Sequence, residues 1–165
     1  MWRLLAILGG VSGAVTLSQF PEFSQQYLQR LAGKVDALTT VTADFDATAQ
    51  KNGLTREAAL AQLTGTQFNL DHQADLRVTF AQAATLSDNL ATLRAATPLA
   101  RLTMPQKLGD AETLQATWAD FKPAIPTTPD GAMTAGIGYV GGWAVVALIW
   151  KLLSWPFRRR HRRYA

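Results

Sequence analysis

The chain has 165 residues, no cysteine and a formal net charge of +4. The lack of thiols excludes disulfide bonds and thiolate metal sites. The positive charge does not indicate a nucleic-acid-binding domain, because seven of the 16 Lys and Arg residues flank two apolar segments. Residues 22–130 contain all 12 acidic residues and nine basic ones, so their formal charge is 9 − 12 = −3.

The first apolar segment follows Arg3 and runs from Leu4 to Phe20, 17 residues without a charge. One interpretation is a signal peptide cleaved after Ala14. The other is an uncleaved transmembrane helix, which we favour because no strong pair of small residues ends the segment. Pro21 predicts a break or kink of the helix near residues 19–22, since proline lacks an N–H donor and disfavours helix at the preceding residue.

The middle of the chain shows helical periodicity without a strand pattern. Four helices are predicted: two long ones over residues 22–51 and 69–96, and two short ones over residues 56–63 and 111–121. Thr55 and Asp110 are suited to cap the short helices, and Asp71 is a candidate cap for the second long one. Gly53 and Gly65 are expected to end the helices before them. Residues 97–109 are expected to be irregular, and the proline-rich residues 122–131 to form a stiff linker.

The second apolar segment runs from Met133 to Leu153. It has no charged residue up to Trp150, and these 18 residues suffice to cross a hydrocarbon core of roughly 30 Å. Basic residues at the ends of apolar spans mark the cytoplasmic side and bind anionic lipid headgroups. The residues predicted to anchor the chain in this way are Arg3, Lys151, Arg158, Arg159, Arg160, Arg162 and Arg163, with His161 inside the cluster.

Glycines occur at matching spacing in the two apolar segments. Gly9 and Gly13 are four residues apart, as are Gly138 and Gly142, and small residues at this spacing allow membrane helices to pack closely. Gly13 lies ten residues from Arg3 and Gly142 lies nine from Lys151, so the glycines would lie at similar depth. We therefore predict an antiparallel transmembrane hairpin. The alternatives are a chance match, or a glycine surface that binds a second copy or another membrane protein.

The polar residues of the middle region were weighed as candidate sites. Asp71, His72 and Asp75 could share one helix face and bind a divalent cation, but capping and solvent exposure explain them more simply. Asp44 and Asp46 are two residues apart on a helix and point in different directions. We predict no metal site, no cofactor and no enzymatic activity.

The apolar stripes of the predicted long helices either form a core or bind a partner. The candidate partner-facing residues are Tyr27, Leu31, Leu38, Phe45, Leu76 and Phe80.

Three stretches resemble a family of uncharacterised two-span inner-membrane proteins of Gram-negative bacteria, classed as a domain of unknown function. They are residues 18–31 (SQFPEFSQQYLQRL), residues 53–60 (GLTREAAL), and residues 121–126 (FKPAIP) with Gly141, Gly142 and Trp143. The resemblance covers nearly the whole chain. It implies a two-span membrane protein and carries no activity, cofactor or catalytic residue.

The predicted fold class is all-α: a two-helix transmembrane hairpin that carries an extramembrane bundle or coiled coil of two long and two short helices. The predicted segments are a first span (1–20), a periplasmic domain (21–132), a second span (133–154) and a basic tail (155–165). The expected location is the bacterial inner membrane, with both termini cytoplasmic. We expect an accessory or scaffold subunit bound to anionic lipid and to a membrane-protein partner or a second copy; the alternative is a periplasmic ligand-binding or sensor module.

Overall fold

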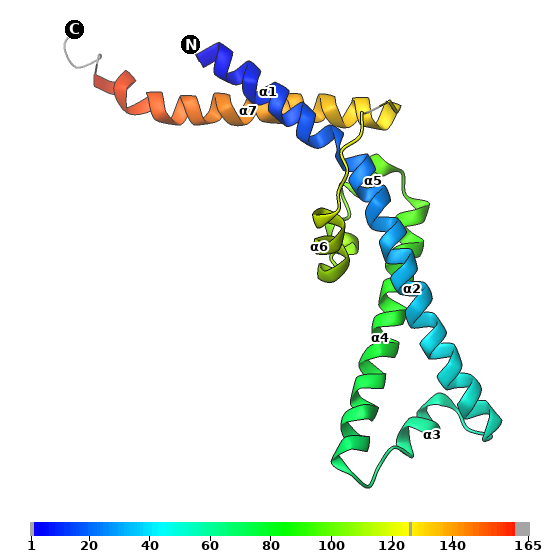
Figure 1. The fold of residues 1–165 in the computed structure, drawn as a ribbon. Helices are drawn as coiled ribbons and strands as arrows, with labels where there is room; N and C mark the ends of the chain where they lie inside the picture. The colour runs from blue at the N-terminus through cyan, green and yellow to red at the C-terminus, as the bar shows by residue number, and fades with distance from the viewer. Residues whose placement is uncertain (1, 126, 161–165) are drawn as a thin grey trace. The chain divides into compact units, whose positions relative to one another are not determined.

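The structure is a computed structural model that describes residues 2–125 and 127–160, with side chains described as far as Ser154. All regular structure in these residues is helical, which confirms the predicted fold class (Figure 1). The elements are α1 (Trp2–Ser18), α2 (Phe20–Lys51), α3 (Arg56–Ala61), α4 (Gln67–Ala95), α5 (Pro98–Arg101), the 3₁₀ helix η1 (Pro105–Leu108), α6 (Ala111–Ala119) and α7 (Pro129–Arg160).

The chain folds into two compact units. The first, the hairpin unit, contains residues up to Gln25, residues 98–103 and residues from Phe121 onward; the second, the helical unit, contains residues 26–97 and 104–120. The division differs from the predicted segments, since α5 and the linker before α7 group with the two apolar helices. Helix α2 begins in the hairpin unit and continues into the helical unit.

Several helix ends lie where the sequence signals predict them. Thr55 accepts a hydrogen bond from the Ala58 N–H at 3.2 Å, and Asp110 accepts one from the Thr113 N–H at 3.1 Å. Gly53 adopts a φ of +69° directly after α2, a conformation that residues with a Cβ rarely adopt. The helix break expected near Pro21 lies between α1 and α2, at Gln19.

Two helices begin earlier than the sequence predicts. Helix α4 is capped by Thr66, which accepts a hydrogen bond from the Asn69 N–H at 3.2 Å, and Asp71 lies inside the helix. Helix α7 begins at Pro129, a residue suited to the first helical turn, and the Thr128 hydroxyl accepts from the Gly131 N–H at 3.1 Å. The stretch predicted to be irregular contains the short helices α5 and η1.

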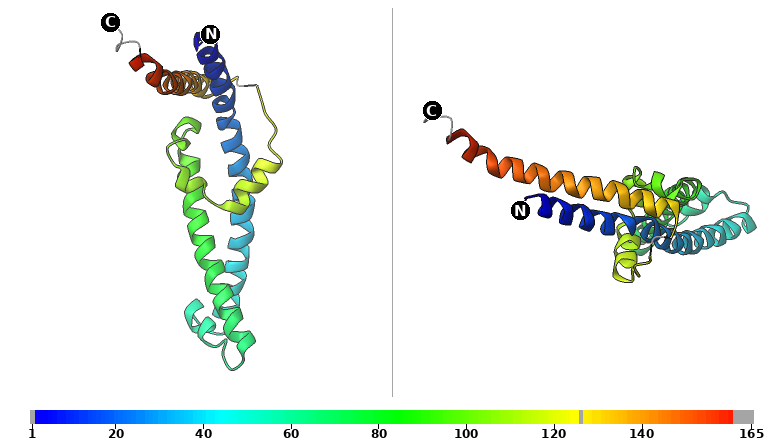
Figure 2. Two further views of the ribbon diagram at one scale, coloured as in Figure 1. Left: turned by 90° about the vertical axis from the view of Figure 1, so that its left-hand side faces the viewer. Right: turned by 90° about the horizontal axis from the view of Figure 1, so that it is seen from above.

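In the hairpin unit, α1 and α7 lie side by side and run in opposite directions (Figures 1 and 2). Small side chains form their contact: Ala6, Gly10 and Thr134 are buried there. The outer surfaces of both helices carry large, exposed apolar side chains. The most exposed of these are Leu4, Leu8, Val15, Val140, Leu152 and Leu153.

In the helical unit, α2 and α4 run in opposite directions and diverge toward one end, where α3 lies between them (Figure 1). The buried apolar residues come from both long helices and from α3 and η1. They are Tyr27, Leu28, Leu31, Val35, Ala49, Leu60, Phe80, Ala83, Leu86, Leu90, Leu93 and Leu108. The rings of Phe45 and Phe80 join α2 to α4 with centroids 5.2 Å apart. Burial of each large apolar side chain contributes about 1.5–3 kcal/mol.

Helix α6 is turned opposite to what its apolar residues suggest. The sequence offers Leu114, Trp118 and Phe121 as a shared apolar side, but the structure buries Thr113 and Thr117 instead. Trp118 is 74% exposed and Leu114 is 38% exposed. The Thr117 hydroxyl donates to the Thr113 carbonyl at 2.7 Å, which satisfies its polar group within the helix and leaves its methyl group to pack.

Polar contacts at both ends of α6 hold it on α2. Lys34 donates to Asp110 at 2.9 Å and to Glu112 at 2.8 Å, while Arg30 pairs with Asp120. The buried Tyr27 hydroxyl also accepts a hydrogen bond from the Asp110 N–H at 3.3 Å. Helix α6 is therefore attached to the unit chiefly through charged and hydroxyl groups.

The Asp110 carboxylate caps α6 and pairs with α2 at the same time. Burial acts to raise the pKa of Asp110, but the hydrogen bonds from Thr113 and Lys34 outweigh it, and the pKa is lowered from its ordinary value of 3.8. A lowered pKa in the folded state means that the ionised carboxylate stabilises the fold above pH 3.8, and that this stabilisation is lost as the pH falls through the lower folded value.

We expect acid to detach α6 and lower the stability of the helical unit. The thermal midpoint of the full chain in detergent, followed by circular dichroism, should fall as the pH is lowered from about 5 to about 2. Asp110→Asn should be less stable than wild type at neutral pH by about 1 kcal/mol, because asparagine keeps the cap but loses the ion pair with Lys34, and should show a flatter acid dependence. Asp36→Asn, an exposed α2 variant, is the control; the same flattening in both variants would contradict the prediction.

Candidate functional site

The contact between α1 and α7 is built on the four glycines that the sequence analysis singled out. A Cβ added to Gly13 would overlap the carbonyl oxygen of Gly138, and a Cβ on Gly138 would overlap the backbone of Gly13. Gly9 and Gly142 meet in the same way, with the built Gly9 Cβ 2.9 Å from the Gly142 oxygen. Moving four residues forward in α1 thus moves four residues back in α7, as an antiparallel pair requires.

The sequence analysis missed a further contact in this pair. Gly10 lies under the ring of Tyr139, whose Cε2 atom would be 2.7 Å from an added Cβ. Gly10 and the fully buried Ala6 are four residues apart, so the small-residue spacing that identified Gly9 and Gly13 could have identified this second stripe. The aromatic partner carried no such signal, because an aromatic residue in an apolar helix more often faces lipid.

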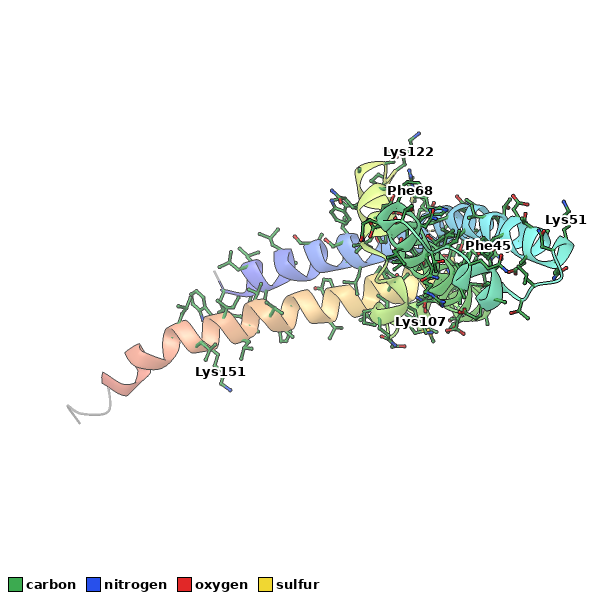
Figure 3. The ribbon with its side chains drawn as sticks, turned by 90° about the horizontal axis from the view of Figure 1, so that it is seen from below. Phe45, Lys51, Phe68, Lys107, Lys122 and Lys151 are labelled. Atoms are coloured by element: carbon green, nitrogen blue, oxygen red, sulfur yellow. The ribbon has the colours of Figure 1, made fainter. Side chains whose placement is uncertain are left out.

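Two helical runs of the described residues are long and apolar enough to cross a membrane: α1 with its continuation, and residues 129–154 of α7. The basic residues predicted to anchor them lie near their ends. Arg3 lies beside the Trp2 ring, and Lys151 projects from α7 (Figure 3). Arg158, Arg159 and Arg160 belong to the last turns of α7, whereas His161, Arg162 and Arg163 lie outside the described residues. Lipid anchoring by these residues stays a prediction.

A buried arginine ties the hairpin unit together. Arg101, at the end of α5, is 6% exposed and donates to Ser24 Oγ at 3.3 Å and to Gln25 Oε1 at 3.2 Å. Burial lowers the pKa of its guanidinium, and the negative charge of Asp130 on α7 acts in the opposite direction. Arg101 therefore connects α5 to the start of α2. Sequence reasoning missed it, because nothing around a single arginine indicates burial.

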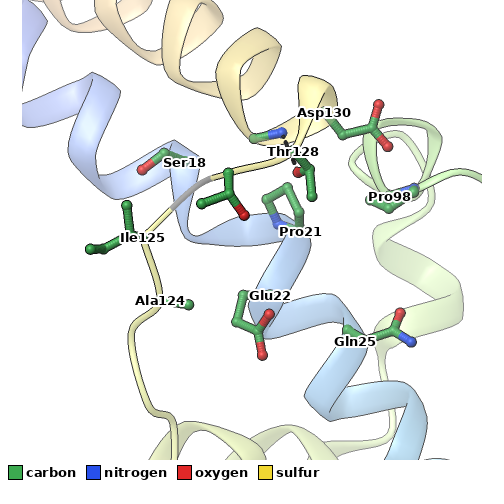
Figure 4. A pocket seen from close by; sticks show the side chains of 11 residues that line it. Ser18, Pro21, Glu22, Gln25, Pro98, Ala124, Ile125, Thr128 and Asp130 are labelled. Carbon is green, nitrogen blue, oxygen red and sulfur yellow. Dashed lines mark hydrogen bonds between the residues drawn. The ribbon is translucent and has the colours of Figure 1, made fainter.

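A cleft of about 320 Å³ lies beside these contacts, where α1 ends and α7 begins (Figure 4). Its lining mixes prolines with hydroxyl, amide and carboxylate groups. The residues are Ser18, Pro21, Glu22, Gln25, Pro98, Ala124, Ile125, Thr127, Thr128, Asp130 and Gly131. Gln19, between α1 and α2, binds the linker here: its Oε1 accepts a hydrogen bond from the Ala124 N–H at 3.1 Å. These groups can accept and donate hydrogen bonds but include no thiol or imidazole.

Asp71 and His72 of the candidate metal site, and Asp46 of the candidate acid–base pair, have other contacts. Asp71 accepts from Gln67 Nε2 at 2.8 Å, and the His72 ring stacks on Phe68 with centroids 6.1 Å apart. Asp46 binds the Arg56 guanidinium, with Nε at 2.7 Å, which lowers the pKa of Asp46 from its ordinary value. Over residues 2–125 and 127–160, no three acidic or histidine side chains are placed to hold a metal ion.

The structure corrects part of the partner-facing prediction. Tyr27 and Leu31 are fully buried and Phe80 is 7% exposed, so all three belong to the core of the helical unit. Leu38, Phe45 and Leu76 are partly exposed. The reason is that α4 packs on the stripe of α2, so the apolar period of each long helix is used within the chain. Exposed apolar residues lie elsewhere, at Phe68, Leu70 and Val78 on α4 and at Trp118 on α6.

This architecture, two apolar helices with a helical region between them, fits a two-pass membrane protein. A family model described as "Protein of unknown function (DUF2937)" matches residues 1–159. The chain belongs to this family, in agreement with the resemblance seen in its sequence. No curated protein and no solved structure matches the chain.

The glycine contact yields a direct test. Gly138→Val should lower the thermal midpoint of the protein in detergent, because the new side chain must push the α1 backbone away, at a cost of about 1–3 kcal/mol. Gly136→Val is the matched control on the same helix, since a Cβ there meets nothing within 4 Å. Equal midpoints for the two variants would contradict the contact.

Proposed function

We propose that this chain is a non-enzymatic accessory or scaffold subunit of the bacterial inner membrane, which presents the helical unit to a protein partner in the periplasm. Two features support the placement. The apolar outer surfaces of α1 and α7 match a lipid environment, and the basic residues gather at Arg3 and beyond Trp150 while residues 22–130 are net negative. In this arrangement both termini are cytoplasmic.

The observation that carries the partner-binding role is an exposed apolar surface at the end of the helical unit where α3 lies. Phe68 is 77% exposed and Leu70 is 46% exposed, although they are on α4, whose later residues Phe80, Ala83, Leu86, Leu90 and Leu93 are in the core. We call the first turn of α4, which carries Phe68 and Leu70, the tip surface; the exposed Val78 lies about 15 Å further along the helix. Exposed apolar groups of this size cost solubility unless they are covered, and clusters of them mark interaction sites.

A groove beside α3 extends the apolar character of this end. It encloses about 560 Å³ and is lined by Phe45, Thr48, Ala49, Asn52, Leu54, Ala59, Gln62 and Leu63. A partner helix could place one or two apolar side chains there while its backbone or polar groups meet Asn52 and Gln62. The same mixed lining supports the alternative function, in which a small molecule binds in the groove and the protein acts as a sensor.

The topology can be tested because the chain has no natural cysteine. In intact cells, a membrane-impermeant maleimide should label Thr85→Cys, an exposed position on α4, and should not label Ala165→Cys until the membrane is permeabilised. Labelling of Ala165→Cys in intact cells would place the carboxyl terminus outside and refute the proposed orientation.

Partner binding can be tested with a photoreactive phenylalanine analogue at position 68 in native membranes. We expect one discrete adduct with another protein, and its loss when Leu70→Ser is added, because both residues lie in the first turn of α4, which a partner at this end would cover. The analogue at exposed Thr85, on the same helix, is the matched control. Adducts of identical pattern from both positions, an adduct only with a second copy, or none from position 68 would contradict the partner role. If the protein bound only a small molecule, the analogue at position 68 would give no adduct with another protein.

A further inference from the structure

Helix α6 presents its two large apolar side chains outward, and its docking explains why. Its buried side consists of Thr113 and Thr117, and its ends are held by ion pairs to Lys34 and Arg30 on α2. Leu114 and Trp118 are one helical turn apart and are 38% and 74% exposed. A helix attached through polar groups and turned with its tryptophan outward is arranged for a contact outside the unit.

The position of α6 in the chain limits what that contact is. Its docking residues on α2, Tyr27, Arg30 and Lys34, are 7, 10 and 14 residues after Phe20, where the first apolar helix has just ended. At 1.5 Å per residue this is about 10–21 Å along the helix. On the other side, Trp118 is 11 residues before Pro129, which allows a reach of at most roughly 36 Å. Both connections keep α6 close to a bilayer that the hairpin spans.

The small contact area of Leu114 and Trp118 favours the membrane interface over a protein as their partner. Leu114 and Trp118 together supply at most roughly 400 Å² of contact, about half of what each partner buries in a stable protein–protein interface. A membrane interface requires much less from each contact, since the hairpin already holds the chain at the bilayer and the second contact is intramolecular. Tryptophan is also the side chain most enriched at the headgroup level, where its ring is apolar and its N–H is solvated.

The charges of α6 are largely compensated. Lys34 pairs with both Asp110 and Glu112, and Arg30 pairs with Asp120, so two cations face three carboxylates and the net charge of these groups is 2 − 3 = −1. We propose that Leu114 and Trp118 insert into the headgroup region of the bilayer and hold α6 against the membrane, as a second anchor beside the hairpin. The proposal rests on the membrane placement given above and is independent of the partner at the tip surface.

Spin labelling tests the anchor in the full chain. The cysteine-free protein carries Gln115→Cys, an exposed α6 position that keeps Leu114 and Trp118, and is reconstituted in vesicles of phosphatidylethanolamine and phosphatidylglycerol. A nitroxide there should be more accessible to oxygen than to a water-soluble nickel chelate, as for a site at the lipid interface. Adding Trp118→Ser should raise nickel accessibility to that of a label at Val78→Cys, an exposed residue of the same unit. A label at Val145→Cys in α7 reports hydrocarbon depth.

The outcomes separate this proposal from the membrane placement. If the label at position 115 is as accessible to nickel as the one at Val78, or if Trp118→Ser changes nothing, the anchor is refuted while a buried Val145 label upholds the hairpin. Shielding of position 115 from both oxygen and nickel means a protein contact, a second copy included, and also refutes it. A nickel-accessible label at Val145 overturns the membrane placement and the anchor together.

Discussion

The backbone contact between Gly13 and Gly138 is the interaction on which the hairpin depends. At this point neither helix has room for a single methyl group, and the equivalent contact of Gly9 with Gly142 fixes the register. Within a bilayer, helices gain no hydrophobic energy by leaving lipid for one another, so close packing of backbones and side chains must supply the association. The glycines allow that packing, and Tyr139 over Gly10 extends it to a second stripe of α1.

The antiparallel register has a consequence for the segments that leave the hairpin. It brings the end of α1 and the start of α7 together, where Arg101 binds Ser24 and Gln25 with Asp130 nearby. A buried guanidinium is costly unless its donors are satisfied, so α5 is held at this place by a geometric requirement as well as by packing. This explains why α5, although it lies between two elements of the helical unit in the sequence, groups with the apolar helices.

Much of the fold could be predicted because its signals are local. Thr55, Asp110 and Gly53 act at the positions of their own hydrogen bonds or dihedral angles, and an apolar run of sufficient length identifies α1 and α7 without reference to anything else. The glycine spacing indicated the helix contact for the same reason, since each helix shows the four-residue spacing within its own sequence. Thr66 was missed as the cap of α4 because Asp71, a stronger capping residue type, lies only five residues on.

The features that sequence reasoning missed are those that depend on a distant partner. Helical periodicity shows that Tyr27, Leu31 and Phe80 share faces of their helices but does not say whether those faces meet each other or another protein. The side of α6 that its apolar residues predict to be buried is the exposed one. The reason is that Arg30, Lys34 and Tyr27 on α2 offer polar partners that turn the other side inward. No pattern within residues 111–119 contains that information.

The energetic consequence of this orientation is that α6 is held on α2 largely by polar contacts. The pair Arg30–Asp120 is largely solvent-exposed and contributes little, about 0–1 kcal/mol, whereas Lys34–Asp110 is sheltered and also caps the helix. A nine-residue helix is below the length that is stable alone in water, so its formation depends on these contacts and on whatever covers Trp118. A contact on the outer side of α6 therefore stabilises the helix itself as well as positioning it. Helix α6 packs on α2 and is followed in the chain by the linker before α7. Its docking on α2 therefore fixes where that linker begins.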